Sequence, residues 1–298
     1  MSSSADLPPA IPGLAAFQKG ADGLTRLQIT SSLANAEVVL EGAHVTRFEP
    51  AGAAPVLFVS RSSWFTPGKP IRGGVPVCFP WFAARAGRPD SPAHGFARTA
   101  RWDLESLAGS DDRGVTAVFR FASDERTRAH WPHEFVARLR IEVAWQLTIT
   151  LEIENPGATP FTFEEALHTY FAVSDVRNVA VTGLENAAYL DKTDGFRRKQ
   201  LGPDPLRFTA ETDRVFPGNV SACVIDDPGQ RRKIIVEKTG SQTTVVWNPW
   251  IARAAALADF GDDEWPHVLC IETANVGDDA VTLSPGATHA MSATIRLA

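Results

Sequence analysis

The sequence of 298 residues contains few cysteines and no long basic run, and each shortage excludes a class of protein. Its three cysteines, Cys78, Cys223 and Cys270, form no CxxC pair and lie in apolar stretches, which predicts buried, reduced thiols in a cytosolic protein. The net charge is −6, so nucleic acid is not expected as a partner. A small anionic ligand remains compatible with this charge, because a few arginines can make a locally positive site.

Long apolar runs are absent as well. No stretch approaches the roughly 18 residues that a membrane helix needs. The first residues, MSSSADLPPAIPG, lack the basic and apolar regions of a signal peptide. We therefore expect a cytoplasmic protein that does not associate with membranes, in which residues 1–13 form a flexible tail.

Helical periodicity and several catalytic signatures are also missing. The sequence shows no long apolar stripe of helical spacing and no alternation of strands with helices, which argues against Rossmann and TIM-barrel folds. It contains no HExxH, GxSxG, P-loop or EF-hand spacing, and its seven histidines show no metal-ligand pairing. The letters DFG at residues 259–261 lack the other kinase motifs and carry no weight. We expect neither a metal nor a cofactor.

The sequence does contain many short runs of β-branched and aromatic residues, separated by 22 glycines and 21 prolines. The clearest is RLRIEVAWQLTITLEIE at residues 138–154, where every odd-numbered position from 139 to 153 is apolar. This alternation predicts strands with one buried face, and the length of the run predicts a hairpin or break near residues 144–146. Shorter runs predict strands at residues 36–40, 115–121, 234–236, 243–247, 281–283 and 292–297.

These patterns predict an all-β protein. A short helix is expected at residues 123–131, with Ser123 or Asp124 as its cap. No linker divides the chain, so residues 1–298 are interpreted as a single domain. The predicted fold is a large antiparallel β-sandwich of two sheets with few short helices.

Two segments combine glycine with a side chain suited to binding. KPIRGGVPVCFPWF, residues 69–82, places Arg72 before a glycine pair, where the backbone can approach a ligand and an arginine can hold an anion or a sugar hydroxyl. SPAHGFAR, residues 91–98, places His94 before a glycine and Arg98 four residues later. The alternative interpretation of the first segment is a tight turn that carries a solvated arginine, and that of the second is a structural histidine.

Two further segments place a titratable residue among apolar ones. FEEALHTYF, residues 163–171, contains His168, and such surroundings lower the proton affinity of an imidazole. WPHVLCIETANV, residues 265–276, contains Glu272, whose pKa desolvation would raise toward that of a useful base. A structural core histidine and a paired carboxylate are the alternatives, and His267 is expected at the surface.

The segments RGGVPVCFPWF, HGFAR, LHTYF, VVWNPW, ADF and CIET, in this order, resemble the aldose 1-epimerase superfamily and most of all its glucose-6-phosphate 1-epimerase branch. The resemblance implies a galactose-mutarotase-like β-sandwich that interconverts the α and β anomers of a hexose 6-phosphate, above all glucose 6-phosphate, without metal or cofactor. By motif, it implies that His168 is the catalytic acid and Glu272 the catalytic base. It also implies four substrate-binding residues: Arg72, His94, Arg98 and Asp213.

The chain departs from the family at Ala93, where many relatives carry a glutamine that contacts the substrate. Another group is expected to make that contact, or the contact is lost. Asp191, in YLDK, resembles a family feature to which we assign no role. Arg61, Arg72 and Arg98 are close in sequence and suit a phosphate through charge-assisted hydrogen bonds, although they could also bind neutral sugar hydroxyls.

Other functions stay open at this point. The fold could serve a non-catalytic carbohydrate-binding or regulatory module, or a mutarotase of unphosphorylated aldoses. A sugar lyase or hydrolase is also possible, with Asp213 as a second carboxylate. The distance between His168 and Glu272 distinguishes an enzyme from a binding module, because a proton-transfer pair must reach one sugar. We expect a monomer whose ligand is a small sugar phosphate.

Overall fold

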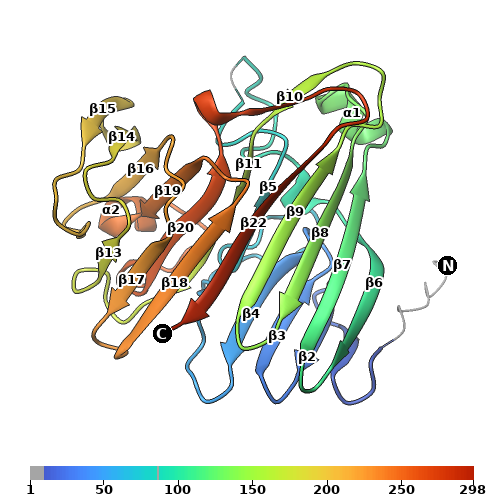
Figure 1. Cartoon of the computed structure of the whole chain (residues 1–298), viewed down its shortest axis with the longest axis horizontal. Coiled ribbons are helices and arrows are strands. Elements are labelled where there is room, and N and C mark those ends of the chain that lie inside the picture. The colour runs from blue at the N-terminus through green and yellow to red at the C-terminus, as the bar shows by residue number, and fades with distance from the viewer. Residues whose placement is uncertain (1–9, 86) are drawn as a thin grey trace.

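Antiparallel strands are the main regular structure of the computed structural model, which describes residues 10–85 and 87–298 (Figure 1). The all-β prediction is confirmed. Residues 1–13 are predicted to form a flexible tail. Residues 1–9 of this segment lie outside the described residues, and Ile11 forms a β-bridge with Ala15. None of the helices in the described ranges has the length and hydropathy of a membrane span.

One sheet of eight strands crosses the molecule in the order β13–β17–β18–β22–β9–β8–β7–β6. The alternating run forms its hairpin of β8 (Val136–Val143) and β9 (Leu147–Glu154), and the predicted break falls at residues 144–146. Burial alternates residue by residue along β9, because only one face lies against the core. The other strands of this sheet are β6 (Asp103–Ser110), β7 (Gly114–Ala122), β13 (Ala180–Thr182), β17 (Cys223–Asp227), β18 (Arg232–Thr239) and β22 (Thr288–Leu297).

A second sheet of eight strands has the order β15–β14–β16–β19–β20–β11–β5, with β12 also paired to β20. Its strand β20 (Val268–Asn275) is buried at every position, because both of its faces are covered. This sheet carries the candidate site. Its remaining strands are β5 (Val77–Cys78), β11 (Glu165–Leu167), β12 (Tyr170–Ala172), β14 (Ala188–Asp191), β15 (Arg197–Gln200), β16 (Thr212–Phe216) and β19 (Thr243–Asn248).

A four-stranded sheet, β1–β2–β3–β4, lies behind β7, β8 and β9 in Figure 1. Large side chains such as Phe48, Trp102, Phe119 and Leu139 fill one continuous core, and burial of each stabilises the fold by about 1.5–3 kcal/mol. The predicted β-sandwich is therefore confirmed. The strands not yet bounded are β1 (Ala15–Lys19), β2 (Thr25–Thr30), β3 (Ala34–Val39), β4 (His44–Pro50) and the pair β10 (Phe161–Phe163) and β21 (Val281–Leu283).

Helices are short, as the sequence predicts. The helix α1 (Glu125–His130) matches the predicted one, and its cap is Asp124, whose side chain accepts a hydrogen bond of 2.8 Å from the backbone N–H of Thr127. The six shorter predicted strands coincide with β3, β7, β18, β19, β21 and β22. The other helical segments are α2 (Trp250–Ala255), η1 (Ala97–Thr99), η2 (Lys192–Asp194), η3 (Trp265–His267) and η4 (Gly277–Asp279).

Candidate active site

A cavity of about 490 Å³ opens over one face of the second sheet. The structure brings into its lining all six residues to which the family resemblance assigns a role, although they come from segments far apart in the sequence. These residues are Arg72, His94, Arg98, His168, Asp213 and Glu272.

Strand register explains why three of the lining residues face the same way. Asp213 of β16 pairs with Trp247 of β19, which in turn pairs with Cys270 of β20. Glu272 lies two residues beyond Cys270 and therefore points to the same face of the sheet. The alternation of the strands thus places a carboxylate on either side of Trp247.

The proton-transfer candidates lie in contact. Nε2 of His168 is 3.3 Å from Oε1 of Glu272, and both side chains are buried. Burial raises the pKa of Glu272 well above its usual value. Burial, with help from the positive charges of Arg98 and Arg72, lowers the pKa of His168 well below that of an ordinary imidazole. Both shifts have the same main cause: burial disfavours the charged form of each group.

His94 is held by an unusual backbone. Its φ is +65°, and the next residue, Gly95, has a φ of +73°. A Cβ on Gly95 would lie 1.9 Å from the carbonyl oxygen of Phe79, so glycine is required at this position. The backbone N–H of Ala83 donates to Nδ1 of His94 at 3.4 Å, and the His94 ring meets that of His168 edge-on at 5.6 Å. The backbone conformation therefore explains the glycine of the HG pair, and the chemistry of the site explains the histidine.

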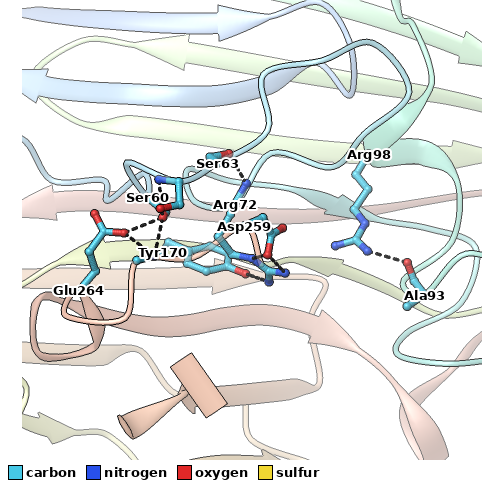
Figure 2. A network of polar contacts seen from close by, with 10 residues as sticks. Ser60, Ser63, Arg72, Ala93, Arg98, Tyr170, Asp259 and Glu264 are labelled. Carbon is cyan, nitrogen blue, oxygen red and sulfur yellow. Dashed lines mark hydrogen bonds and ion pairs between the residues drawn. The ribbon is translucent and has the colours of Figure 1, made fainter. Parts of the chain in front are cut away.

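Arg72 is held rigidly by two partners (Figure 2). Its Nε and Nη2 donate to Oδ1 of the buried Asp259 at 3.2 and 3.0 Å, and its Nη1 donates to the hydroxyl of Tyr170 at 3.2 Å. The backbone N–H of Arg72 donates to Oγ of Ser63 at 2.8 Å. Sequence reasoning missed the contributions of Asp259 and Tyr170, although both lie inside segments that carry the family resemblance.

Arg98 differs from Arg72 because its charge is not neutralised. Its Nη2 donates to the carbonyl oxygen of Ala93 at 2.8 Å, and none of the described carboxylates forms a salt bridge with it (Figure 2). Ala93 lines the cavity with its methyl group in place of the glutamine expected in the family. Arg98 is thus a cation available for an anionic ligand.

The prediction that Arg61 belongs to the site is wrong. Its Nη2 lies 2.6 Å from Oδ1 of Asp263 and its Nε lies 3.5 Å from Oε1 of Glu264. The Arg61 side chain is exposed and does not line the cavity, because these two carboxylates hold it elsewhere. Closeness in sequence to Arg72 does not bring it to the same place.

Asp213 forms a salt bridge of 2.8 Å with Lys192, a lining residue that sequence reasoning missed. Burial raises the pKa of Asp213, and the ammonium group opposes that effect. The neighbouring Asp191 stays outside the cavity lining, where it accepts hydrogen bonds from Thr193 and Lys199 and caps η2. The YLDK segment could have pointed to Lys192, because its lysine lines the cavity whereas its aspartate, Asp191, does not.

The remaining lining residues include groups that no motif singled out. They are Phe82, Ala83, Ala84, Tyr170, Glu211, Trp247, Arg253 and Leu257. Within the described ranges, no group of three or more His, Cys, Asp and Glu side chains has the arrangement of a metal site. His267 is exposed, as predicted, and its Nδ1 contacts the carbonyl oxygen of Ser174.

Comparisons with known proteins agree with this geometry. The family model described as aldose 1-epimerase matches residues 25–296. A relative from Escherichia coli, provisionally named glucose-6-phosphate 1-epimerase, is 34% identical over 277 residues, which cover 93% of this chain and 92% of the relative. A relative of the same provisional name from Salmonella typhimurium is 35% identical over 252 residues, with 85% and 83% covered.

Solved structures show the same similarity. A provisionally named mutarotase from Salmonella typhimurium superposes with a TM-score of 0.90 at 31% identity, and the match covers 97% of this chain and 96% of that one. The galactose 1-epimerase of Lactobacillus acidophilus superposes with a TM-score of 0.72 at 12% identity, with 95% and 98% covered. The second likeness concerns the fold alone.

Proposed function

Since this chain belongs to the aldose 1-epimerase family, we propose that its site interconverts the α and β anomers of a hexose 6-phosphate, with glucose 6-phosphate as the preferred substrate. The family model, the relatives and the solved structures confirm the family, the fold and the epimerase activity that the sequence predicts. The observation that carries the proposal is the contact of His168 with Glu272 inside a cavity large enough for a sugar phosphate.

Anomer exchange requires the ring oxygen to gain a proton while the anomeric hydroxyl loses one. Glu272, as a carboxylate, accepts the hydroxyl proton, and His168, as an imidazolium, donates a proton to the ring oxygen. The bond between C1 and the ring oxygen breaks and leaves an open-chain aldehyde. After rotation about the C1–C2 bond, the hydroxyl formed from the ring oxygen attacks the other face of C1. His168 then takes its proton back and Glu272 returns one to O1.

The pair carries one proton through the whole cycle. That proton lies on His168 while the ring is closed and on Glu272 while the chain is open. Burial favours the second arrangement in the empty site. A phosphate bound near Arg98 would offset part of the positive charge that lowers the pKa of His168 and so favour the arrangement that opens the ring. Each proton transfer contributes about 10²–10⁴-fold to the rate.

The other predicted residues take binding roles in this proposal. Arg98 binds the phosphate, because it has no carboxylate partner among the described residues. Arg72 presents a guanidinium fixed by Asp259 to an oxygen of the substrate. His94 and Asp213, which both line the cavity, bind sugar hydroxyls.

The alternative functions have less support. A binding module needs no acid and base in contact, whereas His168 and Glu272 are 3.3 Å apart. A hydrolase needs a second carboxylate beside the scissile bond, but Asp213 is held by Lys192. A mutarotase of unphosphorylated aldoses would not need the uncompensated charge of Arg98. Our proposal also places the protein in the cytoplasm, which the three free, buried cysteines support.

The test follows anomer exchange of glucose 6-phosphate and of free glucose by NMR magnetisation transfer. Glu272→Gln and His168→Asn should each lower the rate at least about a hundredfold while the protein stays folded. A second His/Glu pair, the buried Glu165 and the partly exposed His289, lies outside the cavity lining and supplies matched controls, Glu165→Gln and His289→Asn, which should keep activity. Near-native rates in both catalytic variants would remove the assignment, and equal kcat/KM for the two sugars would remove the phosphate preference.

A further inference from the structure

We propose that Tyr170 is a positioning residue with two separable roles: its ring fixes the plane of the His168 imidazole, and its hydroxyl fixes the guanidinium of Arg72. The inference rests on the proposed function, because it concerns how the acid and a binding arginine are aligned. Neither the family resemblance nor the proposed reaction assigns a role to this tyrosine.

The imidazole of His168 lacks the usual means of orientation. A catalytic histidine is commonly held by a hydrogen bond at the nitrogen that does not face the substrate. In His168, Nε2 faces Glu272, whereas Nδ1 is buried and has no hydrogen-bond partner among the described residues. The orientation of the ring must therefore come from packing.

Tyr170 supplies that packing over one face of the imidazole. The two rings are nearly parallel, with an interplanar angle of 12° and centroids 4.7 Å apart. The rings of His94 and Trp247 meet His168 edge-on, at 67° and 76°. A rotation of the imidazole about its Cβ–Cγ bond would break the parallel stack and collide with the two edge-on rings. The stack thus keeps Nε2 directed at Glu272.

Tyr170 is itself immobile. Its side chain is 2% exposed, its backbone N–H donates to the carbonyl oxygen of Gly74 at 2.9 Å, and its carbonyl oxygen accepts from the N–H of Phe58 at 2.9 Å. It follows His168 by two residues, and the short link between strands β11 and β12 brings the two rings together. The RGG segment and the HTYF segment are joined here by main-chain hydrogen bonds.

The tyrosine hydroxyl forms a second connection. It accepts a hydrogen bond of 3.2 Å from Nη1 of Arg72, whose other nitrogens are held by Asp259 (Figure 2). Phenylalanine would keep the stack on His168 and lose only this bond. Leucine would lose both. The two substitutions therefore separate a binding role from a role in proton transfer.

The experiment compares kcat and KM for glucose 6-phosphate in three variants. Tyr170→Phe should raise KM about 3–10-fold and leave kcat within about threefold, because Arg72 loses one neutral hydrogen bond. Tyr170→Leu should lower kcat at least about tenfold, because a small displacement of a catalytic group is costly. Phe171→Leu is the control: this ring is fully buried in the main core, outside the cavity lining, so its loss should affect stability but not kcat.

A spectroscopic readout makes the test independent of activity. The ring C–H protons of His168, assigned by comparison with His168→Asn, should be shifted upfield by the stacked ring in the native protein and in Tyr170→Phe, and lose that shift in Tyr170→Leu. A folded Tyr170→Leu with native kcat, an equal fall of kcat in the Phe and Leu variants, or an unchanged shift in Tyr170→Leu would each overturn the inference. Absence of any anomer exchange in the native protein would instead overturn the proposed function, while the shifts still report on the stack.

Discussion

Oε1 of Glu272 and Nε2 of His168 lie 3.3 Å apart, and the His168 ring packs against the rings of Tyr170 and Trp247. Two titratable groups so close together and so well buried cannot take up protons independently. Their burial disfavours both charges at once, so we expect the two groups to bind and release protons as a unit.

The first prediction concerns pH. The second proton adds to the pair only below the ordinary imidazole pKa of 6.5, because the pKa of His168 is lowered, and the first proton leaves only above the ordinary carboxyl value of 4.5, because the pKa of Glu272 is raised. We therefore expect no acid limb of kcat centred on 6.5 as the pH falls from 7 to about 6. The measurement is kcat at saturating free glucose, which avoids the ionisation of phosphate near pH 6. An acid limb centred on 6.5 would contradict the shared-proton interpretation.

The second prediction concerns Arg98. Its substitution by glutamine should lower kcat/KM for glucose 6-phosphate about 10–100-fold, since a charge-assisted bond to phosphate is lost, and should change kcat/KM for free glucose about threefold at most. Arg61→Gln is the matched control, because Arg61 is exposed, bound to Asp263 and remote from the cavity lining. Equal losses for the two sugars would show that Arg98 holds the sugar or the fold rather than the phosphate.

Most of the fold could be predicted from the sequence because strand alternation is a local property. The run that forms β8 and β9 has one face on the core and one on solvent, so its period of two is visible. Strand β20 shows no alternation, since both of its faces are buried, and its place beside β19 and β12 depends on contacts distant in sequence. Pairing order of this kind has no local signal.

The candidate site divides in the same way. His168 and Glu272 stand out because a titratable group in an apolar run is locally unusual, and the family resemblance then assigns them roles. Lys192 does not stand out, because a lysine in a polar turn is ordinary until the fold places it beside Asp213. Arg61 shows the opposite error, since its neighbours in sequence suggest a site and its neighbours in space are carboxylates outside it.

The third prediction concerns the HG turn. Gly95→Ala should destabilise the protein by at least about 3 kcal/mol and raise KM, because the new Cβ would overlap the carbonyl of Phe79 and displace His94. Gly52→Ala has a similar positive φ but no atom within 4 Å of the new Cβ, so it should cost only about 1–2 kcal/mol and leave KM unchanged. Urea unfolding measures both costs. Equal destabilisation would mean that backbone strain alone, not the contact with Phe79, requires the glycine.

The fourth prediction concerns the second His/Glu pair, in which Nε2 of the partly exposed His289 lies 2.9 Å from Oε1 of the buried Glu165. The hydrogen bond to Glu165 raises the pKa of His289, so the stability that this group contributes is fully present below 6.5 and is lost as the pH rises through its folded pKa. Burial raises the pKa of Glu165, which also makes stability fall with rising pH, so the two effects have the same sign. The free energy of unfolding should therefore decrease between pH 6 and pH 9.

His289→Asn should remove the histidine's part of this dependence and cost about 1–3 kcal/mol at pH 6, but less at pH 9, where a larger share of the native histidine is neutral. His267→Asn serves as the control, because His267 is exposed and its Nδ1 contacts only a backbone carbonyl oxygen. Urea titrations at the two pH values measure the difference for each protein. A cost of His289→Asn that is the same at pH 6 and pH 9 would show that the pair acts through packing alone. Native anomer exchange in the same variant would show that this pair, unlike His168 and Glu272, stabilises the sandwich without taking part in the reaction.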